Sequence, residues 1–271
     1  MAFDDPAPQT LAIAPQRSFS LTRVGADGER KGIERPIAEE VPIAFEYQGI
    51  GYAVRLATPR DIVDLAYGFT LSERLVDRAD QIEDVHVHPT SNGFVVRISL
   101  GLAVVDRIFD RDQHRTTDSC CGLCGIERLK QALRPLPRIT TSSLADDAAC
   151  VRALAELDDF QSINRATGAM HAAAACSPGG LIRRVREDVG QHNAFDKLIG
   201  SMMRNADRWD GGFALLSSRC SYELVEKAAI AGCPMLATIS APTALAVDRA
   251  ASAGLRLRAL VRRDALLAFD L

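Results

Sequence analysis

The sequence predicts an α/β protein in which a smaller α+β domain precedes a larger αβα domain. In the second half of the chain, short apolar segments typical of buried strands alternate with segments of helical periodicity, which indicates a largely parallel sheet covered by helices. In the first half, apolar segments pair around a glycine-containing turn and accompany a helical stretch. We expect a flexible N-terminal tail over 1–38, the small domain over 39–117, and a cysteine-containing loop with the αβα domain over 118–271.

The first 38 residues mix proline, glycine, serine and charged residues without sustained periodicity, so we expect them to pack poorly. Ordered structure is expected from about Val41. The elements expected next are strands over 43–47 and 52–56, a helix over 58–69, a short helix over 71–75, and strands over 82–87 and 93–98. The first helix has a defined start, with Thr58 as N-cap, Pro59 at the first helical position and Asp61 in the first turn.

From about Asp146 the pattern alternates between helices and strands. The expected elements are helices over 148–157, 193–203, 222–231 and 243–251, a small-residue run over 169–175, and strands over 181–185, 213–216, 234–239 and 255–261. The strand over 213–216 shows no polar alternation, which indicates that it is buried on both faces.

Composition narrows the functional classes. The chain of 271 residues is 47% hydrophobic and 25% charged, as is usual for a globular protein, and its net charge of −3 gives no general attraction to nucleic acid or membranes. No signal peptide or long apolar span is recognisable, so we expect a cytoplasmic protein. In that reducing compartment, the seven cysteines are expected to serve metal or redox chemistry rather than disulfides.

Three cysteines lie within five residues, Cys120, Cys121 and Cys124. Gly122 and Gly125 permit a tight turn that leaves the thiols uncovered. A helix is expected directly afterwards, over 126–133, and its electropositive N-terminus would lower the pKa of a neighbouring thiol.

Four interpretations of this cluster compete. A structural zinc site requires about four ligands, and the sequence has no second pair. A thioredoxin-like redox pair is expected in a βαβ setting, whereas this pair follows a polar loop over 106–118. Incidental cysteines are hard to reconcile with such clustering. The fourth interpretation, a sulfur relay in which an exposed thiolate carries a persulfide, is the one that we favour.

Four later segments gather small, polar and titratable residues near expected strand–helix corners. They are 165–174 around His171, 186–197 around Gly190, 217–223 and 240–248. Backbone N–H groups after Gly190 can receive a phosphate. Each segment also has a structural interpretation, such as a buried core histidine at His171 or helix capping by Asn193. Since the last three corners belong to one predicted sheet, we expect them to line one cleft suited to an anionic ligand such as a nucleotide.

The motifs and their order resemble the formate dehydrogenase accessory sulfurtransferases, the FdhD family. The resemblance extends from about Val41 to the C-terminus. It is carried by Cys121-Gly-Leu-Cys124-Gly, Thr167-Gly-Ala-Met-His171-Ala, Arg186-Glu-Asp-Val-Gly190-Gln-His-Asn193-Ala-Phe-Asp-Lys197, Arg219-Cys-Ser221-Tyr-Glu223 and Ser240-Ala-Pro-Thr243.

The resemblance implies a cytidine-deaminase-like fold for the αβα domain and a homodimer. It implies that sulfur is accepted as a persulfide from a cysteine desulfurase and passed to the molybdenum cofactor of formate dehydrogenase, in its bis(guanine dinucleotide) form. No cofactor would be held permanently, and that molybdenum cofactor or GDP would bind as substrate. The implied catalytic residues are Cys121 and Cys124, with no metal ligands. The implied nucleotide-binding residues are His171, Gly190, His192, Asn193, Lys197, Arg219, Ser221, Ser240 and Thr243.

Three rival functions and three departures from the family pattern accompany this interpretation. A zinc deaminase is excluded, because Ala173 stands where that class has glutamate after His171, and the cysteine pair precedes the histidine. A cofactor-binding chaperone without sulfur transfer, or a metal-binding structural protein, stays open, as does which of the three cysteines is loaded first. The departures from the family pattern are Met170, Gln191 and Ser218, and they concern nucleotide binding.

Overall fold

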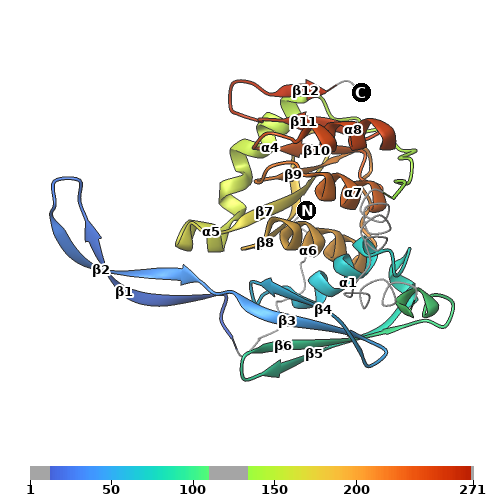
Figure 1. Ribbon diagram of the computed structural model, residues 1–271. Helices are drawn as coiled ribbons and strands as arrows, with labels where there is room; N and C mark the ends of the chain where they lie inside the picture. Colours follow the sequence, from blue (N-terminus) through green and yellow to red (C-terminus); the bar gives the residue numbers. More distant parts are fainter. Residues whose placement is uncertain (1–12, 110–133, 270–271) are drawn as a thin grey trace, which may run out of the picture.

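The computed structural model describes residues 13–109 and 134–269, which form three sheets and the helices that cover them (Figure 1). The strands are β1 (Gln16–Val24), β2 (Arg30–Ala38), β3 (Val41–Tyr47), β4 (Ile50–Ala57), β5 (Ile82–Thr90), β6 (Gly93–Leu100), β7 (His171–Cys176), β8 (Ile182–Asp188), β9 (Phe213–Leu216), β10 (Met235–Thr238), β11 (Arg256–Ala259) and β12 (Leu267–Phe269). The helices are α1 (Ile62–Ser72), the 3₁₀ helix η1 (Ala79–Gln81), α4 (Asp147–Phe160), α5 (Ser162–Thr167), α6 (Gln191–Arg204), α7 (Tyr222–Ile230) and α8 (Ala244–Ala253).

The small domain is a four-stranded sheet in the order β4-β3-β6-β5, covered on one face by α1. Alternate side chains of β3, Val41, Ile43 and Phe45, are buried beneath this helix, as a half-covered strand requires. The N-cap of α1 is Asp61 instead of the expected Thr58, and the helix begins at Ile62. Thr58 bonds through its backbone and its hydroxyl to residues of the larger domain. The separate helix expected over 71–75 is absent, since α1 ends at Ser72 and a turn follows.

The larger domain is a three-layer αβα structure around a six-stranded sheet in the order β12-β11-β10-β9-β7-β8. Strands β9, β10 and β11 run parallel, whereas β7 is antiparallel to both of its neighbours. Helices α6, α7 and α8 pack on one face and α4 on the other, which gives two apolar clusters, one on each side of the sheet. The αβα layering is therefore as predicted, but the sheet is mixed rather than largely parallel.

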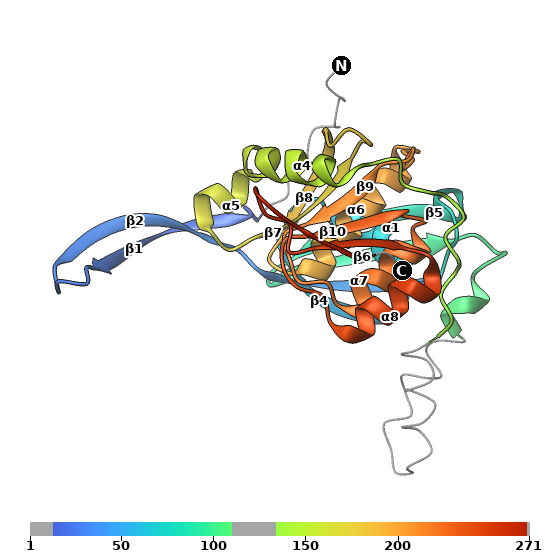
Figure 2. The same cartoon turned by 90° about the horizontal axis from the view of Figure 1, so that it is seen from above.

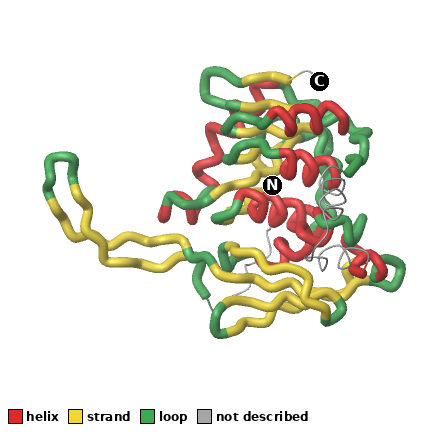
Figure 3. The backbone as a smooth tube through the Cα atoms, in the orientation of Figure 1, coloured by secondary structure: helices red, strands yellow, loops and turns green. Residues whose placement is uncertain are grey.

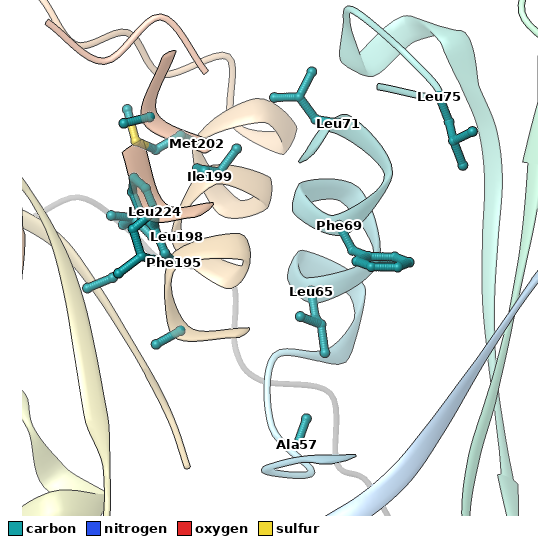
Figure 4. Close-up of a cluster of buried hydrophobic side chains, with 14 of the residues drawn as sticks. Ala57, Leu65, Phe69, Leu71, Leu75, Phe195, Leu198, Ile199, Met202 and Leu224 are labelled. Carbon is teal, nitrogen blue, oxygen red and sulfur yellow. The ribbon is translucent and has the colours of Figure 1, made fainter. Parts of the chain in front are cut away.

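The two domains meet where α1 crosses α6, and glycine makes this contact possible. A Cβ atom on Gly68 would lie 1.8 Å from the carbonyl oxygen of Asp196, and one on Gly200 would lie 1.8 Å from that of Asp64. Figure 4 shows the large side chains pointing away from the crossing: Leu65 and Phe69 towards the small sheet, and Phe195 and Leu198 towards the large one. The two backbones touch at the crossing, and one apolar cluster continues around it from the small sheet to the large one.

Residues 16–38 form a long hairpin arm that extends away from the body (Figure 2). Nine residue pairs join β1 and β2, from Gln16 opposite Ala38 to Val24 opposite Arg30. No strands were expected from the sequence in this segment. Neither strand carries the burial alternation of a strand that covers a core, because nearly every residue of the arm is at least partly exposed.

Candidate functional site

The polar corners predicted from the sequence meet at one edge of the six-stranded sheet. Strands β8, β9 and β10 end there, and antiparallel β7 begins there, so that His171 lies opposite Asp188 in the register. The loops after β9 and β10 are joined by hydrogen bonds from Ser240 N to Ser218 O (3.3 Å) and from Thr243 N to Cys220 O (3.0 Å). We call the corners after these strands, together with His171, the sheet edge.

Asp188 is the centre of this edge. Its carboxylate is fully buried and lies 2.6 Å from the Lys197 ammonium, which is also fully buried. The same carboxylate accepts hydrogen bonds from Gly190 N (2.8 Å), Asn193 Nδ2 (3.1 Å) and Thr58 N (3.0 Å). These bonds fix the turn at Gly190 and the direction in which α6 begins.

Lys197 does not face a ligand in this structure. Its ammonium donates to Thr58 O (3.0 Å) and Glu187 O (3.4 Å) in addition to Asp188, which occupies all three of its protons. The phosphate contact expected from the sequence therefore does not fit its burial. Lys197 instead forms a buried ion pair with Asp188 below the turn.

The small domain is attached directly to this edge. Val189 N donates to Thr58 Oγ1 (3.1 Å), and Asn193 Nδ2 donates to Leu56 O (2.8 Å) as well as to Asp188. Asn193 is buried, and its amide protons serve the domain junction rather than a helix cap. Sequence reasoning missed Thr58 as a site residue. Its place before Pro59 pointed to a helix cap, and nothing local revealed its distant partners.

His192 connects the beginnings of α6 and α7. Its Nε2 atom lies 2.8 Å from Glu223 Oε2 and 3.3 Å from Ser221 Oγ. The hydrogen bond from His192 is the main reason that the pKa of Glu223 is lowered. Because both contacts involve the same ring nitrogen, the group does not form a serine–histidine–carboxylate relay, which requires the two different nitrogens.

His171 is half-buried, and its Nδ1 atom lies 3.5 Å from Ser217 Oγ. Burial lowers the pKa of this imidazole, an effect that the negative charge of Asp188 opposes. His171 is therefore mostly neutral at pH 7, with a donor on one nitrogen and an acceptor on the other.

Two helix N-termini at the edge have no side-chain cap. Neither Gly190 before α6 nor Ser221 before α7 provides a side-chain hydrogen bond to the first helical turn, whereas Thr243 Oγ1 accepts from Ala246 N (3.2 Å) and caps α8. Arg219 is exposed beside them and forms no ion pair with another residue in 13–109 or 134–269. Uncapped N–H groups and a free guanidinium are suitable for an anionic oxygen ligand.

The edge thus brings together nine predicted residues in different roles. His171, His192, Arg219, Ser221 and Ser240 are at least partly accessible, Gly190 and Thr243 shape helix starts, and Asn193 and Lys197 are buried supports. A cavity of about 430 Å³ lies elsewhere, at the far end of α6. Its lining is mostly apolar and includes Met203 and Trp209.

The predicted catalytic residues, Cys121 and Cys124, and their neighbour Cys120 lie outside the described residues. The four described cysteines, Cys150, Cys176, Cys220 and Cys233, are all buried. Burial raises the pKa of Cys150, Cys220 and Cys233 to about 12, so these thiols are protonated and unreactive at neutral pH. Within the described segments, no three side chains of the metal-binding types form a group, and no helix could cross a membrane.

Comparison with known proteins gives consistent matches. The model of the FdhD/NarQ family matches residues 38–270. The sulfur carrier protein FdhD of Agrobacterium fabrum is 41% identical over 250 residues, which cover 90% of this chain and 92% of the relative. That of Chromobacterium violaceum is 42% identical over 255 residues, covering 93% and 94%. The crystal structure of a proposed formate dehydrogenase accessory protein from Desulfotalea psychrophila has the same fold, with a TM-score of 0.75 at 19% identity, and the match covers 94% of this chain and 97% of the other.

Proposed function

Since this chain belongs to the FdhD/NarQ family, we propose that it is a sulfur carrier that serves the maturation of formate dehydrogenase. The observation that carries the proposal is family membership over residues 38–270, a range that contains the cysteine pair of residues 121 and 124. The relatives that support it share about two residues in five with this chain over nine-tenths of its length.

In the proposed reaction, the Cys121 thiolate attacks the outer sulfur of a persulfide on a cysteine desulfurase. A new sulfur–sulfur bond forms on Cys121, the bond in the donor breaks, and the donor cysteine leaves as a thiolate. Cys121 then holds the additional sulfur, and Cys124 assists its release. Thiolate is the required form, because it is the nucleophile in sulfur exchange.

The sheet edge is the proposed binding site for the substrate that receives this sulfur, the molybdenum cofactor in its bis(molybdopterin guanine dinucleotide) form, or for GDP as a part of it. The uncapped starts of α6 and α7 would bind phosphate oxygens, and Arg219 would neutralise their charge. His171, His192, Ser221 and Ser240 offer polar groups to the guanine and ribose. Lys197 and Asn193 support the site through Asp188.

The protein is further proposed to work in the cytoplasm as a homodimer, with a cysteine desulfurase and formate dehydrogenase as its partners. The cytidine-deaminase-like arrangement of the larger domain belongs to the same proposal. What supports this arrangement is the strand order β8-β7-β9-β10-β11, in which β7 runs against the other four.

Sulfur loading is tested by mass spectrometry of the intact protein after incubation with a cysteine desulfurase and cysteine. The expected result is the gain of one sulfur atom on wild type and on Cys120→Ala, and no gain on Cys121→Ala. An equal gain on Cys121→Ala would contradict the role of that residue.

Nucleotide binding is tested separately by titrating GDP into the protein. Arg219→Ala is expected to weaken binding about tenfold, since it removes a charge-assisted contact worth ~1.4 kcal/mol. Arg152→Ala is the matched control, because Arg152 is exposed on α4, across the sheet from α7. Equal affinity of the two variants would contradict the placement of the phosphates.

A cofactor-binding chaperone without sulfur transfer is the second candidate. What supports it is that the groups offered to a nucleotide at the sheet edge, the uncapped starts of α6 and α7 and the Arg219 guanidinium, do not include a thiol. Complementation separates the two functions: a Cys121→Ala variant that restores formate dehydrogenase activity in a deletion strain supports the chaperone, and one that fails supports the sulfur carrier.

A further inference from the structure

The cavity of about 430 Å³ lies at the end of the large sheet that is opposite the sheet edge. The loops that line it precede β9 and β10, whereas the corners of the sheet edge follow β8, β9 and β10. Helix α6 runs between the large and the small sheet (Figure 3), from Gly190 at the sheet edge to Met203 at the cavity. The length of α6, about 20 Å, thus separates the cavity from the proposed nucleotide site.

The apolar wall of the cavity comes from both domains. Leu71 in α1 and Ile199 and Met202 in α6 belong to it, and Figure 4 shows these side chains at the same end of the two crossing helices. Trp209 is half-buried in the wall, and its indole is held in place because Nε1 donates a hydrogen bond to Ala231 O (2.9 Å). Since small-molecule sites have volumes of roughly 300–1,000 Å³, the size and lining fit a small apolar ligand.

The charged side of the cavity carries one cation without a partner. A second cavity of about 240 Å³ adjoins the first and shares four lining residues with it. Two of its arginines are paired, Arg184 with Asp207 (2.9 Å) and Arg183 with Asp210 (3.6 Å). Arg208 lines both cavities, is exposed, and forms no ion pair with any residue in 13–109 or 134–269. The charge left for a ligand is therefore that of one guanidinium.

The loop that contains Arg208 offers backbone donors as well. Within the described part of the chain, the backbone N–H groups of residues 208–211 donate no hydrogen bond. Asp210 and Gly211 have φ angles of 47° and 72°, and successive N–H groups in turns can form a concavity that binds an anion. The nearby carbonyl oxygens of Met202 and Met203 accept hydrogen bonds from the turn after α6 (2.9 and 3.2 Å), which reduces their repulsion of an anion.

We propose that this cavity binds an amphipathic monocarboxylate, with its carboxylate at Arg208 and its apolar body against Trp209. A carboxylate matches the planar guanidinium through two parallel hydrogen bonds, and its single charge matches the single unpaired cation. A phosphate ester would bring about two negative charges. An apolar body of about ten carbon atoms fits the volume, since a group the size of water occupies roughly 30 Å³. The proposal goes beyond sulfur transfer and nucleotide binding and depends on neither.

The first test is titration of the full chain with decanoate, below the concentration at which this acid forms micelles. Calorimetry measures the affinity, and fluorescence locates the ligand, because Trp209 is the only tryptophan in the sequence. The expected result is saturable binding with a shift of the emission to shorter wavelength, since the ligand displaces water from the indole. Octanoate should bind roughly fifteenfold more weakly, because each methylene contributes about fourfold. Absence of saturable binding, or equal affinity for the two acids, would overturn the proposal.

The head group is tested by removing the charge of Arg208. Arg208→Gln is expected to weaken decanoate binding about tenfold, because the charge-assisted hydrogen bonds are lost. Decanamide, which is neutral, should bind wild type and this variant equally. Arg263→Gln is the matched control, since Arg263 is exposed between β11 and β12, away from the cavity. Equal affinity of wild type and Arg208→Gln for decanoate would contradict the position of the carboxylate.

Filling the cavity tests the position of the apolar body. Ala231 lines the cavity, and Ala231→Leu is expected to weaken decanoate binding about tenfold, because the larger side chain occupies the space of the ligand. Ala251→Leu is the matched control, since Ala251 is exposed on α8. Circular dichroism verifies that both variants are folded. A folded Ala231→Leu protein that binds decanoate as tightly as wild type does would refute the placement in this cavity.

Discussion

At the residue scale, the geometry of the sheet edge depends on the buried pair of Asp188 and Lys197. Both side chains are inaccessible to water, and the pair holds the turn at Gly190 and the segment before α1. Removing one member of such a pair leaves an unpaired charge in the interior. The free-energy cost of that unpaired charge is larger than the net stabilisation that the intact pair provides.

Lys197→Met is therefore expected to lower the free energy of unfolding by about 3–5 kcal/mol, because the Asp188 carboxylate loses its counter-ion. Urea denaturation followed by circular dichroism measures the change. Arg138→Met is the control, since Arg138 is exposed and its replacement should change stability by less than about 0.5 kcal/mol. A Lys197→Met protein as stable as the control would show that the pair is not a structural support.

His171 provides a second test at this scale. Burial lowers its pKa below about 6.5, so the imidazole should titrate in the folded protein at a lower pH than in the unfolded chain. A folded pKa below the unfolded one means that stability is complete above pH 6.5 and declines as pH falls through the lowered value. An NMR titration of the ring measures this. Asp188→Asn should lower the pKa of His171 further, because it removes the attraction of that carboxylate for the protonated imidazole. A His171 pKa above 6.5 in wild type would contradict the prediction.

At the element scale, the crossing of α1 and α6 joins the two domains through close backbone contact at Gly68 and Gly200, within an apolar cluster that both domains share. Around it, Asp64 pairs with Arg186 (2.8 Å) and Asp196 with Lys227 (2.7 Å). The first pair connects α1 of the small domain with β8, and the second connects α6 with α7. These pairs therefore help to fix where β8 and α7 lie around the crossing.

Gly200→Ala is expected to destabilise the protein by at least about 2 kcal/mol, despite the higher helix propensity of alanine. The added methyl would lie 1.8 Å from Asp64 O and 2.6 Å from Gly68 N, both backbone atoms that cannot move without separating the helices. Thermal unfolding measures the loss. Gly51→Ala, in β4, has open space at the same position and serves as the control. Equal melting temperatures would mean that the two helices can separate at little cost.

At the scale of the whole molecule, Thr58 connects the small domain to the sheet edge. Its hydroxyl is fully buried and accepts from Val189 N, and its backbone bonds to Asp188 and Lys197. Any ligand at Gly190 would therefore be coupled to the position of the small domain.

Thr58→Val keeps the shape of the side chain but leaves Val189 N–H without its acceptor, at a cost of about 1–3 kcal/mol. Hydrogen exchange is expected to accelerate at residues 56–58 and 188–190 together, because the same bonds join both segments. Thr22→Val in the arm is the control and should leave these amides unchanged. Acceleration confined to one of the two segments would contradict the coupling.

Sequence patterns alone were enough to predict the αβα layering, the doubly buried strand at Phe213–Leu216 and the family to which the chain belongs. Apolar periodicity and ordered motifs are local properties that a linear chain displays directly. The six-residue strand β7 was visible only as a run of small residues, and the strands of the arm at 16–38 were not recognised, because their residues are all at least partly exposed and cover no core in the described part of the chain.

The roles of the titratable residues at the sheet edge depend on contacts between distant segments and could not be read from the sequence. Lys197 and His192 are close in sequence and belong to one motif, yet one is buried against Asp188 and the other stays accessible beside Glu223. Periodicity tells which helix face is apolar, but the burial of a charge depends on partners from distant segments, here Thr58 and Asp188. The antiparallel direction of β7, which places His171 at the carboxyl ends of its neighbours, is likewise set by strand pairing across the sheet and not by any local sequence.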